Sequence, residues 1–243
     1  MNRTLKSLFL LALLAGIGLG VRRLSLGHES AGVPFISDGG ARIFLRAAVI
    51  ALGIGAWFTS QSLVSSRESR DGAIGDAVHE WTRPLNAWLA RDHRAANALL
   101  TISTAFIDIF GLFLLGSALF GPSVRPGVGL LILLAFRQVA QGLCALPTPA
   151  SMIWRKPRFP ALFVTYRVAN DFFFSGHTAV ATLGAIELAH VAPAWIAAIG
   201  ALIAVGEGLT VLILRAHYTM DVLTAAVAAF VAANLAATVC VGF

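Results

Sequence analysis

The sequence predicts an all-α, polytopic membrane protein, a bundle of six transmembrane helices preceded by an N-terminal apolar or interfacial segment. Of its 243 residues, 58% are hydrophobic and only 12% are charged, and the mean hydropathy is +0.81. An ordinary soluble domain has about 25% charged residues, so this composition excludes one. The apolar residues also gather in stretches of about 20, the length that crosses the hydrocarbon core of a bilayer.

The first half of the chain supplies three predicted spans, each with a single charged residue. They are 43–64 with Arg46, 97–120 with Asp108, and 128–146 with Arg137. Each is long enough to cross a membrane as a helix.

The second half supplies three more spans, at 176–191, 194–214 and 222–243. Pro193 lies in the turn between the first two, where a proline can begin a helix without the loss of a backbone hydrogen bond. We therefore expect one six-helix membrane domain at 43–243.

The N-terminal segment, residues 1–42, contains an apolar stretch at 7–21 that is short for a span. No small-residue cleavage pattern precedes the arginine pair that follows it, so a retained interfacial helix is favoured over a cleaved signal. The spacing Gly16-x-x-x-Gly20 is typical of closely packed membrane helices, so a homo-oligomer stays an open alternative.

Basic residues concentrate in three loops, 65–96, 147–175 and 215–221, which hold ten of the 18 Lys and Arg side chains. An even number of crossings separates these loops, so they lie on one membrane face, and their charge favours the cytoplasmic side. Because the basic residues lie in short loops and not on one soluble face, no nucleic-acid partner is expected. Cys144 and Cys240 lie in apolar runs, which predicts neither a disulfide framework nor a thiolate metal site.

The residue types that carry chemistry gather in two of these loops. Ser175 and Gly176 precede His177 at the start of the fourth helix, where a serine N-cap and free helix amides favour an anion. His217 and Asp221 open the last helix, and their spacing of four places the imidazole and the carboxylate on one helix face.

This pattern predicts a catalytic pair of histidines. A carboxylate of Asp221 that holds one ring nitrogen of His217 leaves the other nitrogen as a nucleophile, with His177 as general acid. A single histidine at a helix end is more often a cap or a surface residue, but the complete set at helix ends on one face favours catalysis. The sequence contains no zinc-ligand spacing, so neither a metal nor another cofactor is expected.

Three stretches resemble the lipid phosphatase/phosphotransferase superfamily named after type 2 phosphatidic acid phosphatase, and most closely its sphingomyelin synthase branch. They are Phe174-Ser175-Gly176-His177-Thr178 with Asp171 before it, His217-Tyr218-Thr219-Met220-Asp221-Val222, and Arg137 followed nine residues later by Leu146-Pro147-Thr148-Pro149. The resemblance covers the chain from about residue 43 to the C-terminus.

The resemblance implies transfer of phosphocholine or phosphoethanolamine from a phospholipid donor to a lipid hydroxyl such as ceramide or diacylglycerol. His217 would form a phosphohistidine-type intermediate while His177 protonates the leaving diacylglycerol. The candidate substrate-binding residues are Asp171, Ser175, Gly176, Arg137, Arg215 and Tyr218. A phosphatase or phospholipase C-type hydrolase with the same residues is one alternative, and a non-enzymatic membrane transporter or scaffold is another.

Two further predictions concern residues inside the bundle. At 1.5 Å per residue, Asp108, Arg137, Glu187 and Glu207 fall about 10 to 16 Å below the active face, so we expect them to meet around Arg137 as a shared cation. Candidates for a choline-binding aromatic site are Phe172, Phe173, Phe174, Tyr166, Trp154 and Tyr218, although anchoring at the membrane interface is the commoner role of such residues.

Overall fold

The computed structural model describes residues 39–64, 72, 74–157, 161–166 and 172–240, and the regular structure in these ranges is entirely helical. The predicted all-α class is therefore confirmed. The predicted N-terminal segment, residues 1–42, lies outside the described residues except for residues 39–42, which begin α2.

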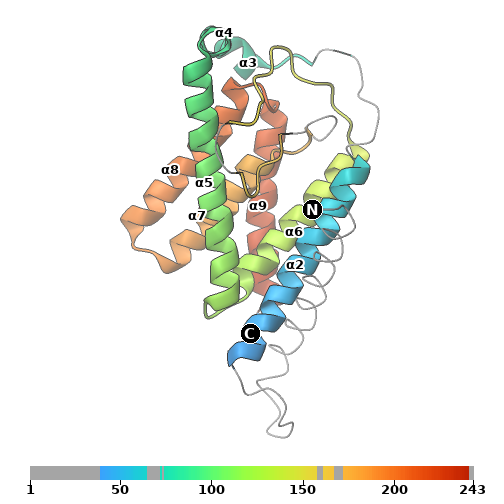
Figure 1. Cartoon of the computed structure of the whole chain (residues 1–243), viewed down its shortest axis with the longest axis vertical. Coiled ribbons are helices and arrows are strands. Elements are labelled where there is room, and N and C mark those ends of the chain that lie inside the picture. Colours follow the sequence, from blue (N-terminus) through green and yellow to red (C-terminus); the bar gives the residue numbers. More distant parts are fainter. Residues whose placement is uncertain (1–38, 65–71, 73, 158–160, 167–171, 241–243) are drawn as a thin grey trace, which may run out of the picture.

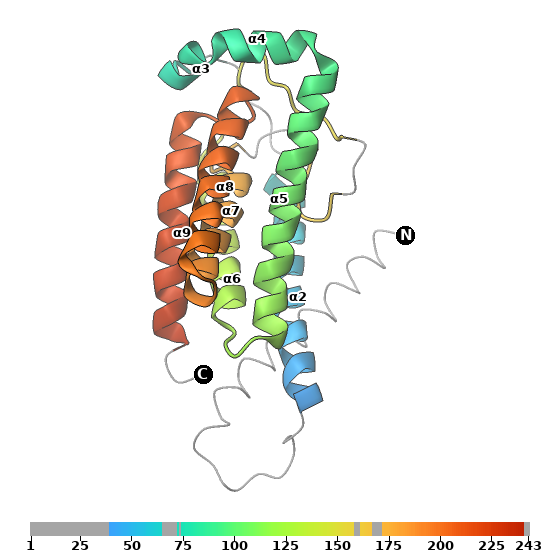
Figure 2. The ribbon, with the colours of Figure 1, turned by 90° about the vertical axis from the view of Figure 1, so that its left-hand side faces the viewer.

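In the described part of the chain, six long helices run along the bundle, and two short helices lie across one end of it (Figures 1 and 2). The long helices are α2 (Gly39–Val64), α5 (His93–Phe120), α6 (Arg125–Leu143), α7 (Gly176–Val191), α8 (Ala194–Ile213) and α9 (Thr219–Val239). The short helices are α3 (Ala77–Trp81) and α4 (Arg83–Arg91). The predicted span 176–191 matches α7 at both ends.

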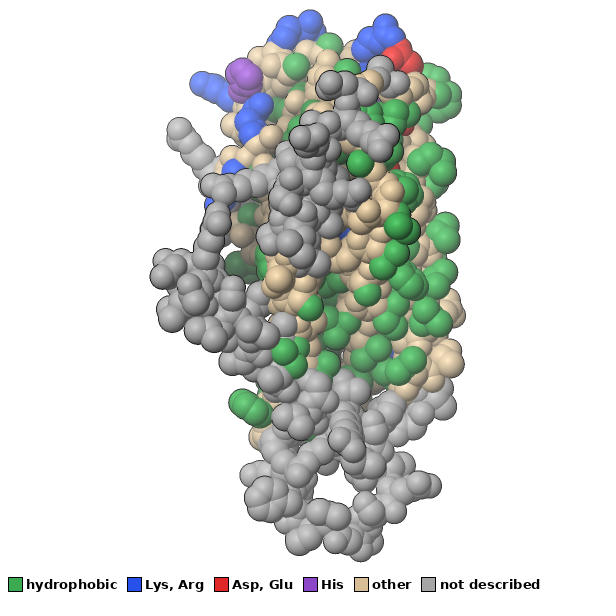
Figure 3. Space-filling view, turned by 90° about the vertical axis from the view of Figure 1, so that its right-hand side faces the viewer, with side chains coloured by type: hydrophobic (Ala, Val, Ile, Leu, Met, Phe, Trp, Pro, Cys, Tyr) green, Lys and Arg blue, Asp and Glu red, His purple; other side chains and the backbone are tan. Residues whose placement is uncertain are grey.

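Four of the described helices, α5, α6, α8 and α9, are long and apolar enough to cross a membrane. The apolar part of α2, Ile43–Thr59, is shorter, and α7 has only 16 residues. Hydrophobic side chains cover much of the visible flank, whereas Lys and Arg gather at the end that carries α3 and α4 (Figure 3). These features support a multi-pass membrane protein, and the count of six spans stays a prediction.

Small residues let α9 pack closely against its neighbours. Ala225, Ala229, Ala232 and Ala236 recur every three or four residues and are fully buried. This spacing forms one helix face without bulky side chains, which allows close approach of helices in a membrane. The same core contains Leu114, Leu133 and Leu183 from α5, α6 and α7.

The connection between α6 and α7 folds back into the bundle (Figure 1). The backbone N–H groups of Leu162 and Phe163 donate to the carboxylate of Asp108, in the middle of α5, at 3.1 to 3.2 Å. The ring of Phe163 lies against Gly111, where a Cβ atom would be 2.6 Å from it. The carboxylate thus accepts hydrogen bonds from backbone N–H groups that would have no acceptor in lipid.

The predicted cluster around Arg137 is wrong, because each intramembrane carboxylate has a different partner. Glu187 forms an ion pair of 2.7 Å with Arg125, and Glu207 accepts a hydrogen bond of 2.6 Å from Ser103. Depth along a helix, which the sequence gives, does not determine the direction in which a side chain points around the axis.

Candidate functional site

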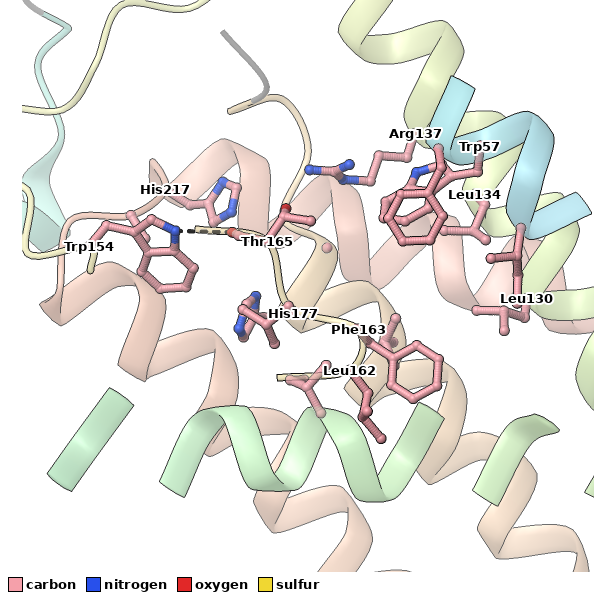
Figure 4. Close-up of a pocket in the computed structure, with 17 residues that line it drawn as sticks. Trp57, Leu130, Leu134, Arg137, Trp154, Leu162, Phe163, Thr165, His177 and His217 are labelled. Carbon is pink, nitrogen blue, oxygen red and sulfur yellow. Dashed lines mark hydrogen bonds between the residues drawn. The ribbon is translucent and has the colours of Figure 1, made fainter. Parts of the chain in front are cut away.

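A cavity of about 340 Å³ lies between α2, α5, α6, α7 and the loop that folds back from α6. Four of its polar wall residues come from different parts of the chain (Figure 4). These residues are Arg137, Thr165, His177 and His217. The remaining wall is mostly apolar, and includes Trp57, Phe58, Leu134, Trp154 and Phe163. The structure therefore brings both predicted catalytic histidines to one space.

The imidazole of His217 is fixed through its Nδ1 atom. Nδ1 lies 2.7 Å from the backbone oxygen of Phe172. A carbonyl oxygen can only accept, so Nδ1 carries the proton and the neutral ring keeps a lone pair on Nε2. None of the described residues forms a hydrogen bond with Nε2. This tautomer is the one in which Nε2 can act as a nucleophile.

Asp221 lies beside His217 but holds it less directly than the sequence predicts. Its Oδ2 atom is 3.7 Å from Nδ1 of His217, beyond hydrogen-bond distance, and accepts a hydrogen bond of 2.8 Å from the backbone N–H of Tyr218. Asp221 is the third residue of α9, and its carboxylate is thereby part of a capping box. The orienting hydrogen bond of His217 goes to Phe172 instead, and Asp221 contributes a fully buried negative charge nearby.

His177 occupies the first turn of α7 and is 7% exposed. Its ring packs edge-on against Trp154, with 5.1 Å between ring centroids. Its Nε2 atom is buried, and no described residue forms a hydrogen bond with it. A buried polar atom without a partner is costly, which marks this nitrogen for contact with a polar group in the cavity.

Ser175 caps α7, as the sequence predicts. Its Oγ atom accepts hydrogen bonds from the N–H and the hydroxyl of Thr178 at 3.3 and 3.1 Å. The adjacent Gly176 lines the cavity, and a Cβ atom there would lie 3.4 Å from Nε of Arg137. The first turn of α7 and the guanidinium group of Arg137 are therefore neighbours in the cavity wall.

Arg137 extends from α6 towards the start of α7. Its Nε donates to the backbone oxygen of Phe174 at 3.2 Å, and its Nη1 donates to Gln61 and Gln141 at 3.1 and 3.3 Å. These contacts hold a cation in the wall of a mostly apolar cavity. A positive charge there attracts an anion such as a phosphodiester.

The other predicted substrate-binding residues lie apart from this cavity or outside the described residues. Arg215 is 7% exposed and donates from Nη2 to the backbone oxygen of His79 at 2.7 Å. Tyr218 is the N-cap of α9, and its hydroxyl donates to the backbone oxygen of Pro147 at 3.2 Å. Both side chains contact protein groups instead of lining the cavity. Asp171 lies outside the described residues.

The aromatic candidates for a choline site also divide into residues that line the cavity and residues that do not. Phe172 and Phe174 are buried in the protein core, whereas Trp154 lines the cavity and donates from Nε1 to the backbone oxygen of Thr165 at 3.3 Å (Figure 4). Sequence reasoning did not single out Trp57 and Phe58 of α2, which also line it. Nothing in their local sequence distinguishes them from lipid-facing aromatics of a span.

Together these residues place two imidazole rings, a guanidinium group and the first turn of α7 around one cavity. Such a set suits displacement at phosphorus, with proton transfer to and from an oxygen.

A search of curated proteins and a search of solved structures found no match for the chain. One family model, AtPDCT1/2, matches residues 75–238, which include α3 to α8, nearly all of α9 and both histidines. This match supports the sphingomyelin synthase resemblance only at the coarser level of a lipid phosphotransferase-related family. The chain belongs to the AtPDCT1/2 family, a family of phosphatidylcholine:diacylglycerol cholinephosphotransferases.

Proposed function

We propose that this protein transfers phosphocholine from phosphatidylcholine to diacylglycerol, with His217 as the nucleophile. The observation that carries the proposal is the hydrogen bond from Nδ1 of His217 to Phe172, which leaves the Nε2 lone pair available in a ring that lines the cavity with His177. The family match favours diacylglycerol over ceramide as the acceptor, and phosphocholine over phosphoethanolamine as the group transferred.

In the first half of the reaction, Nε2 of His217 attacks phosphorus and forms an N–P bond. The bond from phosphorus to the glycerol oxygen breaks, and that oxygen takes a proton from His177, so diacylglycerol leaves. In the second half, His177 removes the proton from the hydroxyl of another diacylglycerol. The resulting oxygen attacks phosphorus, the N–P bond breaks, and phosphatidylcholine forms while His217 returns to its starting state.

In both steps, negative charge develops on the phosphate oxygens. The diester of phosphatidylcholine carries one negative charge, and Arg137 supplies one positive charge beside the first turn of α7. Helix N-terminal amides and a guanidinium group stabilise such oxygens when they are placed before the reaction. The site therefore fits a monoanionic diester.

The apolar wall suits the rest of the lipid. Trp57, Phe58 and Trp154 offer aromatic faces within the cavity, and such faces attract a quaternary ammonium group. The mostly apolar cavity wall favours a lipid hydroxyl over water as the acceptor.

The test is an exchange assay with purified protein in detergent–lipid micelles that contain phosphatidylcholine and a fluorescent diacylglycerol. We expect fluorescent phosphatidylcholine to form, and its formation to stop in His217→Ala. His93→Ala is the matched control, because His93 is an exposed histidine at the start of α5.

Parallel reactions separate the alternatives. Fluorescent ceramide in place of diacylglycerol tests the other acceptor, and phosphatidylethanolamine tests the other donor. Release of free phosphocholine without an acceptor would identify a hydrolase. Absence of any product that depends on His217 would overturn the proposed function.

A further inference from the structure

The segment that carries His217 is a short turn between α8 and α9, and helix α3 holds it from outside. Arg215, in this turn, has a φ of 55°, in the left-handed region that is unfavourable for a residue with a side chain. Backbone of this kind persists only when surrounding contacts determine it. Some of these contacts are local, because the backbone N–H groups of Arg215 and Ala216 donate to carbonyl oxygens of the last turn of α8 at 3.1 and 2.9 Å. Others come from residues about 140 positions earlier in the chain.

Asp76, the N-cap of α3, binds the first residue of α9. Its Oδ2 atom accepts from the backbone N–H of Thr219 at 2.6 Å, and its Oδ1 atom accepts from the hydroxyl of Thr219 at 2.8 Å. Oδ1 also accepts from the backbone N–H groups of Val78 and His79 at 3.0 and 3.2 Å. One carboxylate therefore caps α3 and ties it to the start of α9.

His79, three residues later, binds the peptide of His217 itself. Its Nε2 donates to the backbone oxygen of His217 at 2.9 Å, and its ring stacks on Tyr218 with 5.5 Å between centroids. In return, Arg215 donates to the backbone oxygen of His79 at 2.7 Å. His79 is only 4% exposed, so these bonds are shielded from water.

Helix α4 reinforces the same attachment. Asn86 is buried and donates from Nδ2 to the backbone oxygen of Ile213, the last residue of α8, at 2.8 Å. The turn is thus held at its beginning by α4 and at its centre and end by α3.

We propose that Asp76 and His79 are positioning residues for His217, which set the orientation of its peptide and thereby the direction of its Nε2 atom. The proposal rests on the proposed function. Neither residue lines the cavity that contains His177 and His217, so both act through His217 and not on the lipid. Their loss should therefore lower kcat and leave KM for diacylglycerol nearly unchanged.

The central test compares His79→Leu with His79→Gln. Leucine removes the donor to the His217 carbonyl, whereas glutamine keeps an N–H donor. We expect His79→Leu to lower kcat by about 10-fold to 100-fold, the size that a misplacement near 1 Å can cause. KM should stay within about twofold, and His79→Gln should recover a substantial part of kcat. His93→Leu, the same change at an exposed histidine, is the matched control.

A variant of Thr219 keeps the proposal testable if His79→Leu does not fold. Thr219→Val retains the backbone bond to Asp76 and loses only the hydroxyl bond. We expect a fall in kcat of about threefold, the effect of one modest hydrogen bond, again without a change in KM. Equal kcat in wild type and both variants would overturn the proposal, as would loss through KM alone.

A chemical readout separates this proposal from the proposed function. Diethyl pyrocarbonate modifies exposed imidazole nitrogens, and mass spectrometry gives the rate at His217. We expect this rate to rise severalfold in His79→Leu and to stay unchanged in His93→Leu, whether or not phosphocholine is transferred. An unchanged rate in a folded His79→Leu protein would contradict the positioning role. A wild-type protein without transfer activity would contradict only the proposed function.

Discussion

The carboxylate of Asp108, in the middle of a helix long and apolar enough to cross a membrane, accepts a hydrogen bond of 3.1 Å from the backbone N–H of Phe163. The same carboxylate also accepts from the N–H of Leu162. Phe163 and Leu162 both line the cavity of the two histidines. An isolated charge in a span therefore has a structural explanation, because it holds the loop that forms one wall of the candidate site.

Asp108→Leu should release this loop. The change leaves two backbone amides without their acceptor in an apolar region, at a cost of about 1–3 kcal/mol each. We expect a fall in Tm of several degrees, faster proteolysis within residues 161–166, and a raised KM for the lipid. Asp108→Asn, which keeps one acceptor oxygen, should be intermediate. Unchanged proteolysis in Asp108→Leu would show that the carboxylate does not hold the loop.

Two glycines of α5 offer a matched test of how closely this loop packs. A Cβ atom at Gly111 would lie 2.6 Å from the ring of Phe163, whereas nothing lies within 4 Å of a Cβ atom at Gly116. Alanine in a helix is favoured over glycine by about 1 kcal/mol. We expect Gly116→Ala to raise Tm slightly, and Gly111→Ala to lower both Tm and transfer activity as Phe163 is displaced. Equal melting temperatures for the two variants would contradict this packing.

Asp221 combines two roles that substitutions can separate. Asn at this position can still accept from the Tyr218 N–H but loses the negative charge 3.7 Å from His217. We expect Asp221→Asn to fold with nearly unchanged Tm and to lose at least about tenfold in kcat, because the charge no longer stabilises a cationic imidazole. Asp221→Ala should in addition lose a cap worth about 1 kcal/mol. Full activity in Asp221→Asn would leave only the capping role.

The sequence predicted the six long helices well because apolar length, N-cap residues and turn prolines are local signals, whereas α3 and α4 lie in a segment predicted to be a loop. The end positions of α7 and the cap at Ser175 follow from such signals. The tautomer of His217 could not be predicted, because its partner is the backbone oxygen of Phe172, and a carbonyl has no sequence signature. The role of His79 could not be predicted either, because it depends on a contact with His217, which lies 138 positions later in the sequence.

Arg215 shows why a nearby cation is a weak predictor of a phosphate site. It lies two residues before His217, yet its guanidinium group turns away to bind the backbone oxygen of His79. Burial lowers its pKa, and the neighbouring Arg83 acts in the same direction. Arg137, far from His217 in the sequence, is the cation that lines the cavity among the described residues.

The hydrogen bonds at Asp76 predict an acid-sensitive attachment of α3. Burial acts to raise the pKa of this carboxyl, but the bonds from Thr219 and His79 outweigh it and leave the pKa below the ordinary value of 3.8. The ionised group therefore stabilises the folded state at pH values above about 4. This contribution is lost as the pH falls through the folded-state pKa. We expect the difference in Tm between wild type and Asp76→Asn to be largest near pH 6 and to shrink towards pH 3. A constant difference over this range would contradict a role for the ionised carboxylate.

Arg137 should prove sensitive to geometry as well as to charge. Its planar guanidinium group bridges the Phe174 carbonyl and two glutamine side chains while it lines the cavity beside Gly176. Lysine keeps the charge but cannot reproduce this set of directed bonds. We expect Arg137→Lys to lower kcat/KM by about tenfold and Arg137→Gln by about 100-fold, because the neutral variant also loses charge stabilisation of the phosphate oxygens. Thermal melts control for folding, since the bond to Phe174 holds the segment just before α7. If Arg137→Gln were as active as wild type and equally stable, the phosphate oxygens would have to be stabilised by the α7 amides alone.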